Sequence, residues 1–245
     1  MTPRTIGEVL GPIAYPGRGL AVGLTPDGTR AALAYFLTGR SANSRNREFV
    51  EEDGVIRTRP VDPFLVSDPS LIIYTALRVV GGATILTNGD QTDTVAEALA
   101  TGGTFEAALR TRDYEPDAPN WTSRISALVL PSPDGLAYRL AQLRRATDGT
   151  TVRAFWEYEG APGVGRLLRT YAGDGDPLPA FTGDPVDVAV SDDEDAWTRA
   201  GWDALDADNR IALATRFIPL AGGTPVTRLV NRFGTTSRQG ETWTR

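Results

Sequence analysis

Short apolar segments joined by tight turns recur along the chain, and they restrict the fold to one rich in antiparallel strands. The joining residues are Pro-Asp-Gly, Gly-Gly, Ser-Pro-Asp-Gly and Ala-Gly-Gly-Thr, which are typical of hairpin turns. Four hairpins are predicted: 20–25 with 30–37, 71–80 with 83–87, 124–131 with 136–145, and 210–220 with 225–233. Residues 151–159 and 165–173 predict two further strands.

Helical signals are fewer. Residues 92–111 predict two short helices that are separated by a Gly-Gly pair. Thr94 and Glu97 have the spacing of a capping box for the first helix, and Thr104 can cap the second. Hairpins on both sides of this helical pair suggest two antiparallel sheets with helices packed outside them, although a single-sheet α+β arrangement also fits the composition.

Residues 194–206 predict a third helix. Ser191 is its expected cap, acidic residues fill its first turn, and Trp197, Ala200 and Leu205 lie near one face. With 245 residues and 41% hydrophobic content, the chain fits one large domain or two small ones, and it has enough apolar residues for a sizeable core.

The chain contains no histidine, cysteine or lysine, and these absences exclude several chemistries. They rule out a Ser-His-Asp triad, a cysteine nucleophile, a Schiff-base lysine, a lysine-bearing phosphate loop and zinc held by imidazole or thiolate. A hard metal on carboxylates stays compatible with the sequence, but no calcium-loop pattern occurs. Acid–base groups must therefore be Asp, Glu, Tyr, a hydroxyl or the substrate, and anions must meet arginines or backbone amides.

The net charge of −6 argues against a nucleic-acid partner, which usually needs a broad basic face. Residues 35–52 nevertheless gather Arg40, Arg45 and Arg47 among short hydroxyl and amide side chains, which suits a small anion. No apolar run approaches the length of a membrane span, and the N-terminus lacks the apolar region of a signal peptide. We therefore expect a cytoplasmic protein without a membrane partner.

Four segments carry polar residues that a plain fold does not need, namely 15–19, 35–52, 87–93 and 112–125. Each also has a simple structural explanation as a surface ion pair, a turn, a helix cap or a solvated loop. The residues alone therefore indicate an α+β domain with a small-anion site.

Five motifs occur in series between residues 15 and 130: YPGRG, GRSANSRNR, DPSLIIYTALRV, TNGDQTD and DYEPDAPNWTSRI. Together they resemble the archaeal-type inosine monophosphate (IMP) cyclohydrolase family and its bacterial relatives. The resemblance implies an α+β fold, the four-layered αββα sandwich of two antiparallel sheets found in N-terminal nucleophile hydrolases, in a single domain over residues 1–245.

The resemblance also implies closure of the purine ring, in which 5-formamidoimidazole-4-carboxamide ribonucleotide loses water to give IMP. The carboxamide nitrogen attacks a formyl carbon on the same imidazole, so the protein must hold the reactive rotamer and exclude water. The implied partner is a small-molecule purine ribonucleotide, with no cofactor and no metal. Antiparallel sheets of this kind often associate through edges or outer helices, which is compatible with a homo-oligomer.

Matched motif positions imply the roles of individual residues. Arg40, Ser41, Asn46 and Arg47 are expected to bind the 5′-phosphate, because arginine can contact phosphate through two parallel hydrogen bonds. Arg18 is expected to contact an anion or the base.

The expected catalytic residues are Tyr74 as proton donor, Glu115 as the group that orients or deprotonates the carboxamide, and Asn88. Asn88 and Gly89 are expected to contact the carboxamide or formyl oxygen. The remaining matched residues are expected substrate contacts: Asp93, Asp113, Tyr114, Asn120 and Arg124. Asp93 is equally well explained as a helix cap, and Asp-Gln at 90–91 replaces a Ser-His pair of archaeal members.

Two other functions stay open. The chain could be a different enzyme on the same scaffold, either an amidohydrolase or a ring-closing enzyme acting on a related nucleotide in specialised metabolism. It could also be a nucleotide-binding module without catalysis, because a site that is slightly too loose binds its ligand and does not react.

Overall fold

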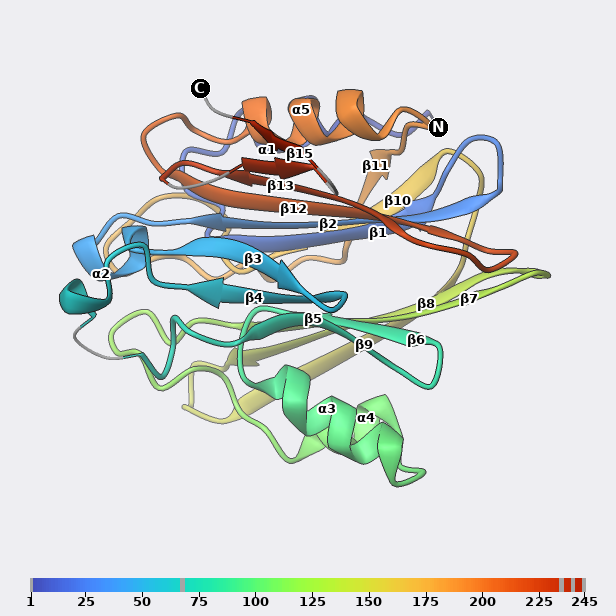
Figure 1. Ribbon diagram of the computed structural model, residues 1–245. Coiled ribbons are helices and arrows are strands. Elements are labelled where there is room, and N and C mark those ends of the chain that lie inside the picture. The colour runs from blue at the N-terminus through green and yellow to red at the C-terminus, as the bar shows by residue number, and fades with distance from the viewer. Residues whose placement is uncertain (1, 67–68, 234–235, 239–240, 244–245) are drawn as a thin grey trace.

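The computed structural model describes residues 2–66, 69–233, 236–238 and 241–243, and these form two antiparallel sheets stacked face to face (Figure 1). In the described residues the first sheet has eight strands, in the order β11 (Val186–Ala189), β10 (Val164–Arg169), β1 (Arg18–Leu24), β2 (Arg30–Thr38), β12 (Arg210–Pro219), β13 (Val226–Asn231), β14 (Thr236–Arg238) and β15 (Glu241–Trp243). The second has seven, in the order β3 (Glu48–Glu52), β4 (Val55–Arg59), β5 (Thr75–Val80), β6 (Ala83–Thr87), β7 (Arg124–Ser132), β8 (Gly135–Arg145) and β9 (Thr151–Glu159).

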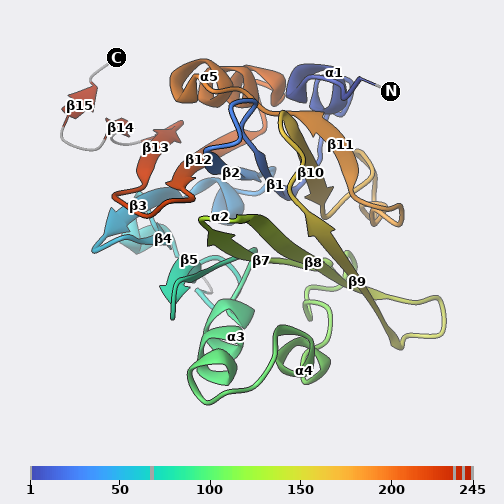
Figure 2. The same ribbon diagram turned by 90° about the vertical axis from the view of Figure 1, so that its right-hand side faces the viewer.

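Helices cover the outer face of each sheet (Figures 1 and 2). The helices α1 (Ile6–Leu10) and α5 (Glu194–Ala204) pack on the first sheet, and α3 (Gln91–Ala100) and α4 (Phe105–Arg110) pack on the second. The expected α+β class and the two-sheet arrangement are therefore confirmed.

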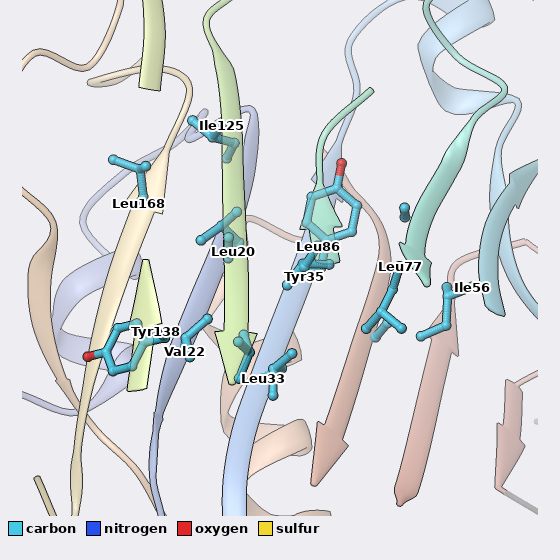
Figure 3. Packing of buried hydrophobic residues seen from close by; sticks show 14 of the residues in the cluster. Leu20, Val22, Leu33, Tyr35, Ile56, Leu77, Leu86, Ile125, Tyr138 and Leu168 are labelled. Carbon is cyan, nitrogen blue, oxygen red and sulfur yellow. The ribbon is translucent and has the colours of Figure 1, made fainter. Parts of the chain in front are cut away.

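Strand β2 shows how the sequence produces this layering. Leu33 and Tyr35 point into the core between the sheets, whereas Ala34 and Phe36 point toward the outer helices. Because successive side chains of a strand alternate between its faces, a strand that is buried on both sides needs a continuous apolar run. The core between the sheets includes Leu20, Val22 and Leu33 from one sheet and Ile56, Leu77, Leu86, Ile125 and Tyr138 from the other (Figure 3).

All four predicted hairpins form, as the antiparallel pairs β1–β2, β5–β6, β7–β8 and β12–β13. Strand β9 spans the predicted residues, and β10 is shorter than predicted because it ends at Arg169. The strand predicted over 71–80 begins only at Thr75. Tyr74 therefore precedes β5, and its backbone N–H donates to the hydroxyl of Thr58 at 2.8 Å.

The two helices predicted within 92–111 also form, but the capping box predicted for the first is wrong. Helix α3 begins at Gln91, so Thr94 lies inside it, and Asp90 occupies the N-cap position without a side-chain capping bond. The cap predicted for α4 is confirmed, because Thr104 accepts a hydrogen bond from the backbone N–H of Ala107 at 3.1 Å.

Helix α5 is capped by Asp193, which accepts from the N–H of Ala196 at 2.9 Å, and not by Ser191 as predicted. Ser191 instead accepts from the backbone N–H of Asp193 at 3.1 Å. Trp197 and Leu205 are buried as expected, but Ala200 is exposed because it lies on the solvent side of the helix.

Several elements were not predicted. The hairpin β3–β4 turns at Asp53-Gly54, where both residues have positive φ. The short helix α2 (Ala42–Arg45) and the 3₁₀ turn η1 (Pro63–Leu65) interrupt segments that the sequence left irregular. Among the helices of the described residues, none combines the length and apolarity needed to cross a membrane.

Candidate active site

A pocket of about 290 Å³ opens where the ends of both sheets meet, near the small end of the range for ligand sites. The antiparallel registers place the start of β1 beside the end of β2 and the end of β10. This main pocket is lined by Tyr15, Gly17, Arg18 and Thr38 near β1 and β2, by Arg40, Ser41, Ser44 and Arg47 around α2, by Leu71 and Ile72 before β5, by Glu115, Asp117, Asn120 and Thr122 before β7, and by Tyr171 and Leu178 after β10.

Arg47 is a buried cation on the wall of the main pocket, with a relative exposure of 4%. Its Nε donates to the carbonyl of Ser44 at 2.9 Å, and no carboxylate among the described residues forms an ion pair with it. Burial lowers the pKa of Arg47, and the positive charge of Arg18 acts in the same direction. Because arginine keeps its charge in proteins, this position favours an anionic ligand.

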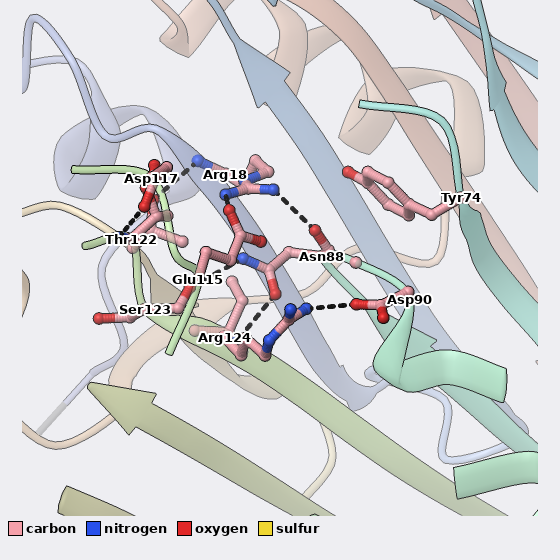
Figure 4. A network of polar contacts seen from close by, with 12 residues as sticks. Arg18, Tyr74, Asn88, Asp90, Glu115, Asp117, Thr122, Ser123 and Arg124 are labelled. Carbon is pink, nitrogen blue, oxygen red and sulfur yellow. Dashed lines mark hydrogen bonds and ion pairs between the residues drawn. The ribbon is translucent and has the colours of Figure 1, made fainter. Parts of the chain in front are cut away.

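Arg18 and Glu115 form a buried ion pair (Figure 4). Both residues line the main pocket together with Arg47. The Nη2 atom of Arg18 lies 2.5 Å from Oε2 of Glu115, and its Nη1 donates to the carbonyl of Asn88 at 2.8 Å. Burial raises the pKa of the Glu115 carboxyl, against the opposing effect of the Arg18 charge. A carboxylate whose pKa is raised is a stronger base, so in a pocket it is suited to take a proton from a ligand.

Arg40 is the more exposed arginine of the main pocket. Its Nη1 lies 2.5 Å from Oδ1 of Asp174, and its guanidinium carbon lies 4.8 Å from the ring centroid of Tyr15. Ser41 also lines the main pocket, and its hydroxyl caps α2 by accepting from the N–H of Ser44 at 3.1 Å. The side chain of Asn46 lies elsewhere, because it exchanges two hydrogen bonds with the backbone of Asp62, at 2.7 and 2.8 Å.

Tyr74 is buried next to the main pocket without lining it. Its hydroxyl oxygen lies 2.7 Å from that of Tyr35, which projects from β2 and is buried in the core. Figure 4 shows the Tyr74 hydroxyl on the side of Arg18. The predicted proton donor and the predicted base therefore lie around one guanidinium.

The segment before β7 brings Asp117 and Thr122 to the pocket wall, where Tyr171 joins them from the C-terminal half. Asp117 accepts from the backbone N–H of Thr122 at 2.6 Å and also from its hydroxyl. The hydroxyl of Thr122 in turn contacts that of Tyr171, and the Tyr171 ring stacks on Tyr15 with centroids 6.0 Å apart. Asn120 accepts from the N–H of Leu178 at 3.1 Å.

Asn88 lies behind Arg18 and does not line the main pocket. Its Oδ1 accepts from the N–H of Ile125 and from Gln91, both at 2.8 Å, and its amide donates to the carbonyl of Ser123 at 2.9 Å. The Asn88 side chain thus links the end of β6 to the start of β7 and to α3, and the Asn88 backbone carbonyl orients Arg18.

The backbone of Gly89, the next residue, lies so close to Arg124 that a Cβ atom there would be 2.8 Å from Nη1 of Arg124. Arg124 is bound to the acceptors around it: Nη1 donates to Asp90 at 2.6 Å and to Gln91 at 2.7 Å, and Nε donates to the carbonyl of Asp113 at 3.0 Å. Both residues therefore shape the wall behind Glu115, and neither lines the main pocket.

The structure does not bring the other three expected contacts to the main pocket. Asp93 pairs with Arg78 at 2.9 Å, and it is a helical residue of α3 that caps nothing. Asp113 pairs with Arg153 at 2.7 Å, and the Tyr114 hydroxyl donates to the carbonyl of Gly149 at 2.9 Å. Asp113 and Tyr114 line a separate, more open hollow.

Sequence reasoning assigned six of the residues that line the main pocket and left the others unassigned, among them Tyr15, Asp117, Thr122 and Tyr171. The first three lie inside motifs that the sequence singled out, where they stood beside the residues that were assigned. Tyr171 carries no local signal, because only the pairing of β10 with β1 brings it there. Among the described residues, no cluster of three carboxylates could hold a metal ion.

Comparison with known proteins shows which family the chain resembles. A family model described as "IMP cyclohydrolase-like protein" matches residues 15–222. The IMP cyclohydrolase of Methanopyrus kandleri is 29% identical over 198 residues, which cover 75% of this chain and 98% of the relative. The IMP cyclohydrolase of Methanococcus maripaludis strain C7 is 32% identical over 47% of this chain and 58% of the relative. The IMP cyclohydrolase of Halobacterium salinarum is 28% identical over 62% of this chain and 77% of the relative.

Proposed function

Since the chain belongs to the IMP cyclohydrolase-like family, we propose that it is an enzyme that converts 5-formamidoimidazole-4-carboxamide ribonucleotide into IMP and water. The observation that carries this proposal is the composition of the main pocket. A buried arginine that is not ion-paired within the described residues lies beside a buried carboxylate–arginine pair. The arginine outside the pair suits the phosphate of a nucleotide, and the carboxylate–arginine pair suits an acid–base cyclisation.

In this proposal Arg47 binds the 5′-phosphate in the interior and Arg40 approaches it from the mouth. The two groups suit these tasks, because Arg47 is buried whereas the Arg40 side chain is 40% exposed. Binding of phosphate to Arg47 offsets the cost of burying its charge. Ser41 and Asn120, which also line the main pocket, are additional contacts for the ribose or the base.

Ring closure joins the carboxamide nitrogen to the formyl carbon. Glu115 takes a proton from the attacking nitrogen, which its raised pKa favours, and Arg18 fixes the orientation of the carboxylate. Tyr74 gives a proton to the formyl oxygen as negative charge develops on it. The resulting hydroxyl then leaves as water with the proton that Glu115 has taken, and the proton of the formamide nitrogen returns to the Tyr74 oxygen, which restores both residues. Asn88 acts indirectly through Arg18.

The test is incubation of the purified protein with the formamido nucleotide and quantification of IMP against the uncatalysed background. Turnover above background is expected, and Tyr74→Phe should lower kcat more than it weakens IMP binding. Binding of IMP without turnover would contradict the proposal and leave a non-catalytic nucleotide-binding module. Turnover of simple amides, with no IMP formed, would identify an amidohydrolase instead.

A further inference from the structure

A hydrogen-bonded chain of Asp117, Thr122 and Tyr171 lies on the wall of the main pocket and has no role in the chemistry described above. Asp117 accepts from both the backbone N–H and the hydroxyl of Thr122. The Thr122 hydroxyl also contacts the Tyr171 hydroxyl. Thr122 and Tyr171 are 2% and 5% exposed, so water cannot easily replace these contacts.

The direction of the hydrogen bonds along this chain follows from the number of hydrogens. A carboxylate only accepts, so Thr122 donates its single hydroxyl hydrogen to Asp117. Thr122 can then only accept from Tyr171, and Tyr171 must donate its single hydrogen to Thr122. The phenolic oxygen of Tyr171 is left with lone pairs and no hydrogen to offer to a ligand.

We propose that Tyr171 is a binding residue that accepts an N–H or O–H hydrogen of the nucleotide, with its polarity set by Asp117 through Thr122. The identity of the ligand rests on the proposed function. Tyr171 then recognises a ribose hydroxyl or the amide-derived N–H of the purine ring. It disfavours carbonyl and phosphate oxygens, which meet Arg18 and Arg47 instead.

Two further contacts keep Tyr171 in this role. Its ring stacks on Tyr15, at an interplanar angle of 24°, and Arg40 lies over the same Tyr15 ring. Burial raises the pKa of Tyr171, and the charge of Asp117 acts in the same direction, so the phenol keeps its proton. An acceptor that is neutral and fixed in place discriminates between hydrogen-bonding groups more sharply than a mobile one.

The decisive variant is Asp117→Asn, which keeps the shape of the side chain and reverses the direction of the hydrogen bonds that run to Thr122 and Tyr171. The new amide must still offer its oxygen to the backbone N–H of Thr122, so its NH₂ group faces the Thr122 hydroxyl and donates to it. Thr122 then donates to Tyr171, and Tyr171 turns its hydrogen toward the ligand. Two donors face each other, which is worse for binding than the loss of the hydroxyl.

Calorimetric titration with IMP measures this effect. Tyr171→Phe should weaken binding about fivefold, the value of one neutral hydrogen bond, and Asp117→Asn should weaken it more. The double variant should bind like Tyr171→Phe, because reversal has no consequence without the hydroxyl. Multiplicative losses in the double variant, or a smaller loss in Asp117→Asn than in Tyr171→Phe, would overturn the proposal.

Asp148→Asn is the matched control. Asp148 also accepts from the backbone N–H and the hydroxyl of a threonine, Thr150, at 3.0 and 2.7 Å, but it does not line the main pocket. Its substitution should leave IMP affinity unchanged. Titrations with 2′-deoxy-IMP and 3′-deoxy-IMP separate the two donors: if either removes the effect of Tyr171→Phe, a ribose hydroxyl is the donor, and if neither does, the purine N–H is.

A measurement without ligand separates this proposal from the proposed function. The ¹³Cζ resonance of Tyr171, assigned by its loss in Tyr171→Phe, should shift in Asp117→Asn and stay in place in Asp148→Asn. An unchanged resonance in Asp117→Asn would overturn the hydrogen-bond direction. Failure of the wild type to bind or form IMP would instead contradict the proposed function, and the resonance would still report the direction of the chain.

Discussion

Replacement of Arg47 by methionine tests the anion site most directly. The Nε atom of Arg47 is already committed to the Ser44 carbonyl, so its two terminal nitrogens are the groups that can bind phosphate. Two hydrogen bonds to a charged group, at about 1.5–3 kcal/mol each, give about 3–6 kcal/mol. At about 1.4 kcal/mol per factor of ten, Arg47→Met should weaken nucleotide binding by about 10²- to 10⁴-fold.

The same substitution should have a different effect on the free protein. Methionine removes a buried charge that has no ion-pair partner among the described residues, and with it the cost of desolvation. The loss of the bond from the charged guanidinium to Ser44 costs about 1.5–3 kcal/mol in the other direction, which the several kcal/mol of relieved desolvation offset. We therefore expect the free energy of unfolding without ligand to stay within about 1 kcal/mol of the wild type, or to rise.

Titration calorimetry with IMP and urea unfolding of the free protein measure the two quantities. Arg45→Met is the matched control, because Arg45 ends helix α2 only two residues before Arg47, donates to the carbonyl of Gly39 at 3.1 Å and does not line the main pocket. Its IMP affinity should stay within about threefold of the wild type. A folded Arg47→Met variant with unchanged affinity, or equal losses in both variants, would refute the assignment of the phosphate to Arg47.

Three further outcomes are expected. The pKa of Glu115 is higher in the folded state than in the unfolded state, so between these two pKa values only the folded state keeps the proton. The wild-type free energy of unfolding should therefore fall as pH rises from the unfolded to the folded pKa. Glu115→Gln should lack this dependence in urea titrations from pH 4 to 8, and an identical pH profile would contradict the shift. Tyr35→Phe should lower kcat severalfold with little change in KM, because Tyr74 loses the partner that orients it; unchanged kcat would exclude that role. Asn88→Ala should lower the free energy of unfolding by about 2–4 kcal/mol, since three buried hydrogen bonds disappear, and a calorimetric Tm close to that of the wild type would argue against it.

The sequence was sufficient for the hairpins whose turns are built from glycine between apolar strands, because both signals are local. It missed β3–β4, although Asp53-Gly54 is a favoured turn pair, because the flanking strands carry Glu48, Glu52 and Arg59. These charges belong to an edge hairpin, where Glu48 pairs with Arg59 across the strands at 2.6 Å. Charged edge strands therefore look like loops in a single sequence.

The start of α3 shows a second limit. The carboxylate of Asp90, the residue before the helix, binds Arg112 and Arg124 instead of capping the helix, and both arginines are distant in sequence. The same limit applies to the site. Arg18, Arg47 and Glu115 could be selected from motifs, whereas Tyr171 joins them only through strand pairing across the molecule.

The strand order also has a consequence for synthesis on the ribosome. The hairpin β1–β2 emerges early, but its outer neighbours are β10 and β12, whose residues lie at 164–169 and 210–219. Between about 125 and 170 residues must be added after β2 before these partners exist. At about 5–20 residues per second this takes roughly 6 to 35 seconds, during which two apolar strand edges stay unpaired. Nascent chains of this protein should therefore depend on chaperones that shield strand edges, and chains truncated before residue 164 should aggregate instead of forming the pocket.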